Sequence, residues 1–426
     1  MANGVSWIAV TLISMGTFLA LQTVEANPSL DDKVPDFALK YAPLIWLHSE
    51  DPFRPSDVLQ HIRHTTPALD FEPLFGLPEL GLDNLEILNQ FGHEVSLTSA
   101  DDVTLMPEWI MGEVPDADGK LHRSTACCVI LVEKGPRDVD VFYFYFYSYD
   151  RGSNITQVLE PIDSLFDLTD EEKKMHFGDH VGDWENNMIR FRDGMPVGIY
   201  YSQHTSGKVY DWESKEVEKV DNRPVVYSAL GSHANYARTG KHVHDSVLID
   251  YCDAGPRWDP VQSAYFFHLD PDSFKLTRRF LPSETDTDSN FTSFLHYNGR
   301  WGDKQYPDSD PRQMTVPYFK IKRFQTGPTG PLSKQLVRKG LSPDHPHIES
   351  WMEWAVRIYM SWYPCCLRGW RVWVSGALLL GFLLTVTFGV VCAVRRHKGQ
   401  GYKKLESDVA LQDMLRRGSF DSIETA

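Results

Sequence analysis

The stretch that decides the fold is "DVDVFYFYFYSYD", residues 138–150. Phenylalanine and tyrosine alternate along it, and valine precedes them, so the run is made of residue types that strands favour. Side chains of a strand alternate between the two faces of a sheet. The run is long enough to be a central strand, and it predicts a sheet around itself.

Shorter segments on both sides extend this prediction. Turn-forming residues separate them, "RDGMP" at 192–196 and "HTSG" at 204–207. Because no helical segments alternate with them, we predict a mainly β fold, a β-sandwich with short helices. One such helix is expected at 55–64, with Ser56 as its N-cap. Further strands are predicted at 41–48, 184–192, 197–204, 207–212 and 223–230.

Two apolar segments indicate a secretory membrane protein. Residues 5–21 resemble a signal peptide, cleaved after Ala26 or retained as a signal anchor. Residues 372–394 carry no charge and would span about 34 Å at about 1.5 Å per residue, enough for one C-terminal transmembrane helix. The basic residues that follow, 395–398, predict a cytosolic tail by the positive-inside rule.

The chain therefore divides into five expected parts. Two stretches are expected to be loose: the polar stretch 281–290, and the Pro/Gly-rich stretch 325–347, which is typical of a linker toward the membrane. The parts are a signal peptide at 1–26, the luminal domain at 27–325, a linker with a juxtamembrane amphipathic helix at 326–371, the transmembrane helix at 372–394 and the cytosolic tail at 395–426.

The juxtamembrane segment carries an apolar stripe of helical spacing. Trp351, Trp354, Ile358 and Trp362 recur at i, i+3, i+7 and i+11. Two interpretations remain open. The helix lies in the membrane interface, or it is a stalk helix packed on the luminal domain.

A luminal location changes how other residues are interpreted. Asn154 and Asn290 each begin an N-glycosylation sequon, so both are expected on surface loops. Cys127 and Cys128 would point to opposite faces of a strand, and one of them could pair with Cys252. The net charge of −16 argues against nucleic acid as a partner.

The stretch "GDHVGDWENN", residues 178–187, carries the candidate chemistry. Asp183 and Glu185 are two apart on a predicted strand, and His180 lies in the preceding loop. Two carboxylates side by side are costly unless something positive neutralises them. A divalent cation would do so, and so would an arginine, the candidates being Arg190, Arg192 and Arg223.

Polar residues at other strand ends favour the cation. Asp150 ends the aromatic strand, His204 ends "VGIYYSQH", and His233 follows "RPVVYSAL". If consecutive strands pair, these groups gather at one edge of the sandwich. His204 and His233 are candidate general bases. The candidate metal ligands are Asp150, His180, Asp183 and Glu185, and this oxygen-rich set favours Mg²⁺ or Ca²⁺ over Mn²⁺ or Zn²⁺.

The motifs "HVGDWENNMIRF", "RPVVYSALGSHANYA" and "DAGPRWDP" resemble the fungal and plant family of vacuolar protein sorting-associated protein 62. That resemblance covers most of residues 37–325 and implies a role in vacuolar sorting. A more distant similarity is to the necrosis- and ethylene-inducing-like (NLP) proteins. It implies a divalent cation held on a β-sandwich by His180, Asp183, Glu185 and Asp150. Those proteins carry a second histidine where this chain has Gly182.

Three hypotheses follow. The first is a type I membrane glycoprotein of the vacuole or plasma membrane whose cation site binds a glycan or lipid headgroup. The second is a membrane-tethered, metal-dependent hydrolase of glycan or lipid. The third is a structural or adaptor membrane protein with no metal. In the tail, "YKKL" at 402–405 matches a pattern that sorting adaptors bind, and Ser419 resembles a kinase site.

Overall fold

The computed structural model describes residues 32–154, 176–204, 206–243, 249–282, 284, 291–315, 322–344, 351–367 and 369–420. The chain forms two compact units. The first, called the body below, comprises Met1–Gly152, His176–Gly240 and Tyr251–Pro346. The second comprises Ser153–Met175, Lys241–Asp250 and His347–Ala426. The expected signal peptide and Asn290 lie outside the described residues, and Asn154 is half-buried.

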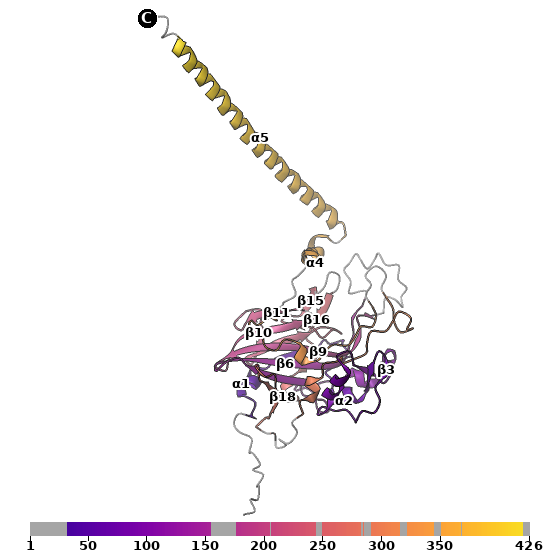
Figure 1. The fold of residues 1–426 in the computed structure, drawn as a ribbon. Coiled ribbons are helices and arrows are strands. Elements are labelled where there is room, and N and C mark those ends of the chain that lie inside the picture. Colours follow the sequence, from indigo (N-terminus) through magenta and orange to yellow (C-terminus); the bar gives the residue numbers. More distant parts are fainter. Residues whose placement is uncertain are drawn as a thin grey trace, which may run out of the picture. The chain divides into compact units, whose positions relative to one another are not determined.

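The body is mainly β and contains several sheets, as the sequence predicts (Figure 1). Its largest sheet has seven strands in the order β11-β10-β9-β6-β5-β18-β19. The predicted strand at 138–150 is confirmed as β6, the central strand of this sheet, which pairs with β5 on one side and β9 on the other. The seven strands are β5 (Cys127–Glu133), β6 (Asp138–Asp150), β9 (His180–Arg192), β10 (Met195–Gln203), β11 (Ser206–Asp211), β18 (Ala264–Leu269) and β19 (Leu276–Arg279).

A second sheet has five strands, in which β1 pairs in parallel with β13. Its strands are β1 (Leu44–Trp46), β12 (Lys219–Val220), β13 (Arg223–Ser228), β14 (Asn235–Tyr236) and β17 (Arg257–Trp258). A third sheet joins β2 (Thr65–Leu69), β3 (Glu72–Pro73) and β4 (Ser96–Ser99). Shorter strands are β7 (Ser153–Asn154), β8 (His176–Phe177), β15 (Gly240–Val243) and β16 (Ile249–Cys252).

The alternation of β6 divides the core of the body in two. Tyr143 and Tyr145 belong to a cluster shared with Ile45, Val226 and Trp258 of the five-stranded sheet, so the two sheets face one another across it. The phenylalanines at 142, 144 and 146 belong to the cluster on the other face of β6. The tyrosine hydroxyls find partners inside the core, since Tyr143 donates to the carbonyl of Ala38 at 2.7 Å. Each fully buried aromatic side chain contributes about 1.5–3 kcal/mol of hydrophobic stabilisation.

The helices of the body are short. They are α1 (Asp36–Lys40), α2 (Val58–Arg63), α3 (Ser293–His296) and the 3₁₀ turns η2 (Leu85–Phe91), η3 (Val103–Leu105), η4 (Glu108–Met111), η8 (Pro260–Gln262) and η9 (Pro331–Ser333). The predicted helix at 55–64 is α2, but its N-cap is Asp57, whose Oδ1 accepts from the amide of Gln60 at 2.8 Å. Ser56 is instead buried and accepts from the amide of Ser148.

The Pro/Gly-rich segment expected to be loose packs on the body from residue 325 to 344. Leu336 and Arg338 are each 2% exposed. The guanidinium of Arg338 lies 5.0 Å from the ring centre of Phe142 and 4.7 Å from that of Tyr200. It also donates to three carbonyls of its own loop, so a buried cation holds this segment in place.

Cysteine placement settles part of the pairing question. Cys127 and Cys128 do point to opposite faces, because they belong to the two different core clusters. Neither of them forms a disulfide with Cys252, so the pairing left open in the sequence is not formed. Cys365 and Cys366 form a disulfide in the second unit.

The second unit contains two helices, α4 (Trp351–Trp362) and α5 (Arg371–Phe420), joined through a π turn at Tyr363–Leu367. Within α5, the segment Arg371–Lys398 is long and apolar enough to cross a membrane. It contains an 18-residue window with a mean hydropathy of 2.5, none of which is buried. It contains the predicted span at 372–394. The helix continues beyond it into the predicted tail (Figure 1).

Candidate metal site

The antiparallel pairing of β6 with β9 builds the candidate site. These strands are in register along their length, so that Asp150 lies opposite His180 and Tyr147 lies opposite Asp183. Asp150 and His180 are far apart in sequence, and the pairing of the two strands brings them next to each other in space. His180 is the first residue of β9 and not part of a preceding loop.

Gly182 sets the path of the chain between His180 and Asp183. Its φ is +70°, a conformation that favours glycine, and a Cβ placed on it would lie 2.0 Å from the carbonyl oxygen of Trp301. No other residue fits without moving the backbone of Trp301. Position 182 therefore supplies no side-chain ligand to the site.

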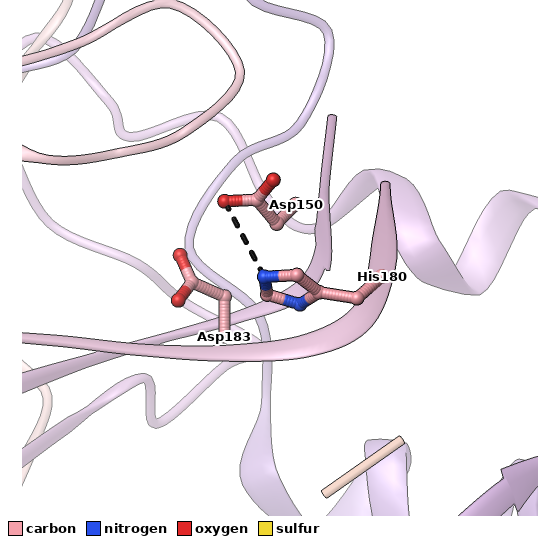
Figure 2. A group of neighbouring side chains, drawn as sticks. All are labelled: Asp150, His180 and Asp183. Atoms are coloured by element: carbon pink, nitrogen blue, oxygen red, sulfur yellow. Dashed lines mark ion pairs between the residues drawn. The ribbon is translucent and has the colours of Figure 1, made fainter. Parts of the chain in front are cut away.

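Asp150, His180 and Asp183 converge on one small volume (Figure 2). Each offers one ligand atom, and the three atoms lie within 4.8 Å of one another. His180 Nε2 is 3.7 Å from Asp150 Oδ2, which is too long for a hydrogen bond. Two oxygens that each lie about 2.3–2.6 Å from a Ca²⁺ ion are at most about 5 Å apart. This group could therefore hold a divalent cation.

The ring of His180 is oriented for metal binding. Its Nδ1 lies 2.7 Å from the carbonyl oxygen of Gly182. Because a carbonyl only accepts, Nδ1 carries the proton, and Nε2 keeps its lone pair on the side of Asp150. Burial lowers the pKa of His180, which favours this neutral form. A neutral imidazole with a fixed tautomer is the form that ligates metals.

A second row of side chains holds Asp183 in place. His233 Nδ1 lies 3.0 Å from Asp183 Oδ2, and its Nε2 lies 3.5 Å from Asp51 Oδ2. The His233 ring stacks on Tyr147 with centroids 3.7 Å apart and planes 2° from parallel. Asp51 is fixed in turn, since its Oδ2 accepts from the amide of Gly231 at 2.7 Å. His233 is 1% exposed, so it is part of the interior of the site.

Glu185 contributes a buried carboxylate with an unsatisfied oxygen. Burial, followed by the charge of Asp183, raises the pKa of Glu185 to about 8. Ser202 donates to it, and the charges of Lys334 and His204 oppose the rise. Its Oε2 has no hydrogen-bond partner among the described residues. A buried carboxylate oxygen of this kind favours a proton or a cation nearby.

The predicted site residues are thus distributed as follows. Asp150, His180 and Asp183 form one group, and His233 contacts Asp183 directly. Glu185 and His204 lie within electrostatic reach of one another and outside that group. Asp179, beside His180 in the sequence, accepts from the hydroxyl of Tyr149 at 2.7 Å and the amide of Gly152 at 3.0 Å.

The arginines considered as neutralising partners are engaged elsewhere. The Nε and Nη2 atoms of Arg190 donate to the two carboxylate oxygens of Asp140, at 2.7 and 2.8 Å. Arg192 pairs with Asp138 and Arg223 pairs with Asp259. The alternative in which one of these three arginines neutralises the site acids is therefore not supported.

Asp51 is the residue that sequence reasoning missed. It lies five residues after the end of β1, in "LHSED". The same signal that singled out Asp150 and His233, a polar residue shortly after a buried strand, was present there. The parallel pairing of β1 with β13 brings Asp51 to His233, and such a crossover pairing is not readable from local sequence.

Comparison with known proteins identifies the family. The sequence model of "Vacuolar protein sorting-associated protein 62" (Vps62) matches residues 167–310. A Saccharomyces cerevisiae protein named "Putative vacuolar protein sorting-associated protein TDA6" is 30% identical over 76% of this chain and 70% of its own length. This chain belongs to the Vps62 family. The Saccharomyces cerevisiae protein named Vps62 is itself 29% identical to this chain, over 75% of it and 70% of its own length.

Solved structures similar to this Vps62-family chain are NLP proteins. One is necrosis and ethylene inducing protein 2 from the causal agent of cocoa's witches' broom disease, with a TM-score of 0.23 and 12% identity over 49% of this chain and 69% of that chain. Another is the protein NLPPya in complex with mannosamine, with a TM-score of 0.24 and 11% identity over 54% of this chain and 71% of that chain.

Proposed function

We propose that this Vps62-family protein is a single-pass type I membrane glycoprotein whose luminal β-sandwich holds a divalent cation and uses it to bind a ligand during vacuolar or endosomal trafficking. The proposed ligands of the ion are Asp150, His180 and Asp183, with Glu185 close by. The proposed topology places the body in the lumen and the residues after the span in the cytosol, as their basic character favours. The names of the two yeast relatives refer to vacuolar sorting and support the trafficking role.

The observation that carries the proposal is the three-residue group itself. Asp150 and Asp183 are mostly buried, and burying two carboxylates together is costly without a compensating charge. The orientation of His180 Nε2 toward Asp150 leaves a lone pair available. Two carboxylates and one imidazole form an oxygen-rich set, which favours Mg²⁺ or Ca²⁺ over Mn²⁺ or Zn²⁺.

Three protein ligands leave coordination positions of such an ion open. Both Mg²⁺ and Ca²⁺ take six or more oxygen ligands, so hydroxyl or anionic groups of a partner can complete the shell. A glycan or lipid headgroup offers such oxygens. Lys334, which acts on Glu185, would add a cation for an anionic group. On the cytosolic side, the sequence at 402–405 is the proposed contact for a sorting adaptor.

The decisive test is metal binding by the full chain in detergent. Calorimetric titration of chelator-treated protein with Ca²⁺ or Mg²⁺ is expected to give one site per chain. Asp183→Asn should abolish it, and Asp179→Asn should keep it, because Asp179 is bonded to Tyr149 and Gly152. Absence of any binding by the wild-type protein would leave the third hypothesis, an adaptor without metal.

Metal-dependent hydrolysis remains the second candidate. His204 is half-buried at the end of β10 and near Glu185, where a ligand could meet it. His233 is enclosed between two carboxylates and a tyrosine ring, which favours holding Asp183 over taking a proton from water. Turnover on a panel of glycans and lipids, lost in Asp183→Asn and in His204→Gln, would support this candidate. Binding without turnover would support the first.

A further inference from the structure

We infer that α4 is a membrane-binding helix, and that Trp351, Trp354, Ile358 and Trp362 insert between the lipid headgroups and acyl chains of the membrane that α5 crosses. This inference rests on one part of the proposed function, the membrane span in α5. It is independent of the metal site. The four side chains are called the α4 face below.

The α4 face is exposed to a degree unusual for such large apolar groups. The exposed fractions are 76% for Trp351, 54% for Trp354, 40% for Ile358 and 58% for Trp362. A helix of 12 residues is marginal in water, and helical stability in proteins comes mostly from packing an apolar face. The α4 face therefore needs an apolar surface to cover it.

The candidate span lies directly after this helix. Only residues 363–370 separate the end of α4 from the start of α5. Two hydrogen bonds tie this corner to the first turns of α5. Ser375 Oγ donates to the carbonyl of Cys366 at 2.7 Å, and Arg371 Nη1 donates to the carbonyl of Cys365 at 3.3 Å. The disulfide between Cys365 and Cys366 further restricts the corner. The α4 helix is thus kept beside the end of the span, where the membrane surface lies.

Tryptophan is the residue that this location favours. Its ring is apolar and its N–H is polar, so it concentrates where the headgroups meet the hydrocarbon. Trp370 and Trp373, at the start of the span, are 72% and 80% exposed and mark the same level. Three of the four residues of the α4 face are tryptophans, so the α4 face and the start of the span both favour the boundary between headgroups and hydrocarbon.

A second copy of the chain is the competing occupant. Helices that pair with one another usually do so through aliphatic a and d positions repeated over several heptads. The α4 face has one aliphatic residue and extends for 12 residues. A lipid surface accepts a short helix with bulky rings more readily, because it needs no matching holes.

Lipid quenching of tryptophan fluorescence tests this inference on the full chain in liposomes. The chain has twelve tryptophans, so Trp370→Phe and Trp373→Phe first remove the two that lie at the start of the span. Lipids brominated near the headgroup end of the acyl chain should then quench at least about twofold more than lipids brominated near the methyl end. Replacing Trp351, Trp354 and Trp362 by glutamine should remove this lipid-dependent quenching.

A second variant guards against misfolding of the triple replacement. Ile358→Asp keeps every tryptophan and places a charge in the middle of the α4 face, so the shallow quenching should fall while the far-ultraviolet dichroism of the body stays unchanged. Wild-type quenching that is absent, or equal for the two lipids, would overturn the inference. Dimers in nanodiscs that the glutamine variant converts to monomers, without lipid quenching, would show that a second copy covers the α4 face instead.

Alkaline carbonate extraction separates this failure from failure of the proposed span. A chain that is released from liposomes by carbonate does not cross the membrane, and then both the span and the inference fall. A chain that resists carbonate and shows no shallow quenching keeps its span and refutes only the membrane binding of α4.

Discussion

At one end of the β6–β9 strand pair, Asp140 is fully buried and the guanidinium of Arg190 donates to both of its oxygens. At the other end, Asp183 is almost as buried, and its partner is the imidazole of His233. The first carboxylate is neutralised by a permanent cation of the chain. Within the described residues, Asp183 and Glu185 contact histidine and serine, and Lys334 acts on Glu185 only through its charge.

The difference teaches where the chain supplies its own counter-charge and where it does not. An arginine paired with a buried carboxylate is a structural ion pair, because the guanidinium neutralises the carboxylate and no further ion is needed. Histidines with several carboxylates leave negative charge that a proton or a metal ion can take up. The same two strands therefore make a structural end and a candidate binding end.

The largest effect is expected at the arginine end. Asp140→Asn leaves the mostly buried guanidinium of Arg190 without its carboxylate, which should lower the free energy of unfolding by about 3 kcal/mol or more. Denaturant unfolding of the full chain in detergent would measure it. The loss should be equal with EDTA and with Ca²⁺. A loss that Ca²⁺ restores would break the contrast between the two ends.

Asp183→Asn should behave in the opposite way. With EDTA, stability should stay the same or rise, because one of two neighbouring like charges is gone. The stabilisation that the wild type gains from Ca²⁺ or Mg²⁺, about 2.7 kcal/mol at a hundred times Kd, should disappear. Thermal unfolding with and without the ion gives both values. If this variant loses stability in EDTA as Asp140→Asn does, the carboxylate is structural.

His233 sharpens the comparison through two matched variants. An asparagine amide can take the place of Nδ1, which faces Asp183, and a glutamine amide can take the place of Nε2, which faces Asp51. His233→Gln should weaken Ca²⁺ binding by about 10- to 100-fold, the usual effect of losing a group that orients a metal ligand. His233→Asn should bind more tightly than His233→Gln. Equal affinities in calorimetry would argue against a role in orienting Asp183.

Over a single pH unit, the smallest effect is a pH dependence of the metal-free protein. Burial and Asp183 raise the pKa of Glu185 to about 8 in the folded chain, from an ordinary value of 4.5. Between these values the folded state holds a proton that the unfolded state has released. Stability in EDTA should therefore fall as pH rises through this window, by at most about 1.4 kcal/mol per pH unit. Glu185→Gln should flatten this slope in unfolding curves measured from pH 5 to pH 8, and an unchanged slope would contradict the assignment.

Much of the fold could be predicted because its signals are local. The alternating aromatic residues of 138–150 predict a strand by their period of two, and the turn residues around 192–196 mark where one strand ends and the next begins. The group Asp150, His180 and Asp183 could also be anticipated, since consecutive strands usually pair and polar groups at strand ends then meet.

The remainder depends on contacts between distant segments. The sequence around Arg190 does not indicate that this side chain faces Asp140. Because Arg190 pairs with Asp140, it is not the partner of the acids at the candidate metal site. Asp51 reaches His233 only through a parallel crossover. The stretch 325–344 resembles a loose linker in composition, and Arg338 holds it on the body by stacking on rings from other strands.

The position of Arg338 also has a consequence for biosynthesis. One face of β6 is covered by the loop that Arg338 anchors, and that loop is not complete until residue Leu341 has been made. The candidate span begins at Arg371, which the ribosome reaches about 2–6 s later at about 5–20 residues per second. In the proposed topology, with the body in the lumen, the newly made sheet would stay partly uncovered during almost the whole of translocation. Chaperones of the secretory compartment would then have their longest opportunity to bind at this face.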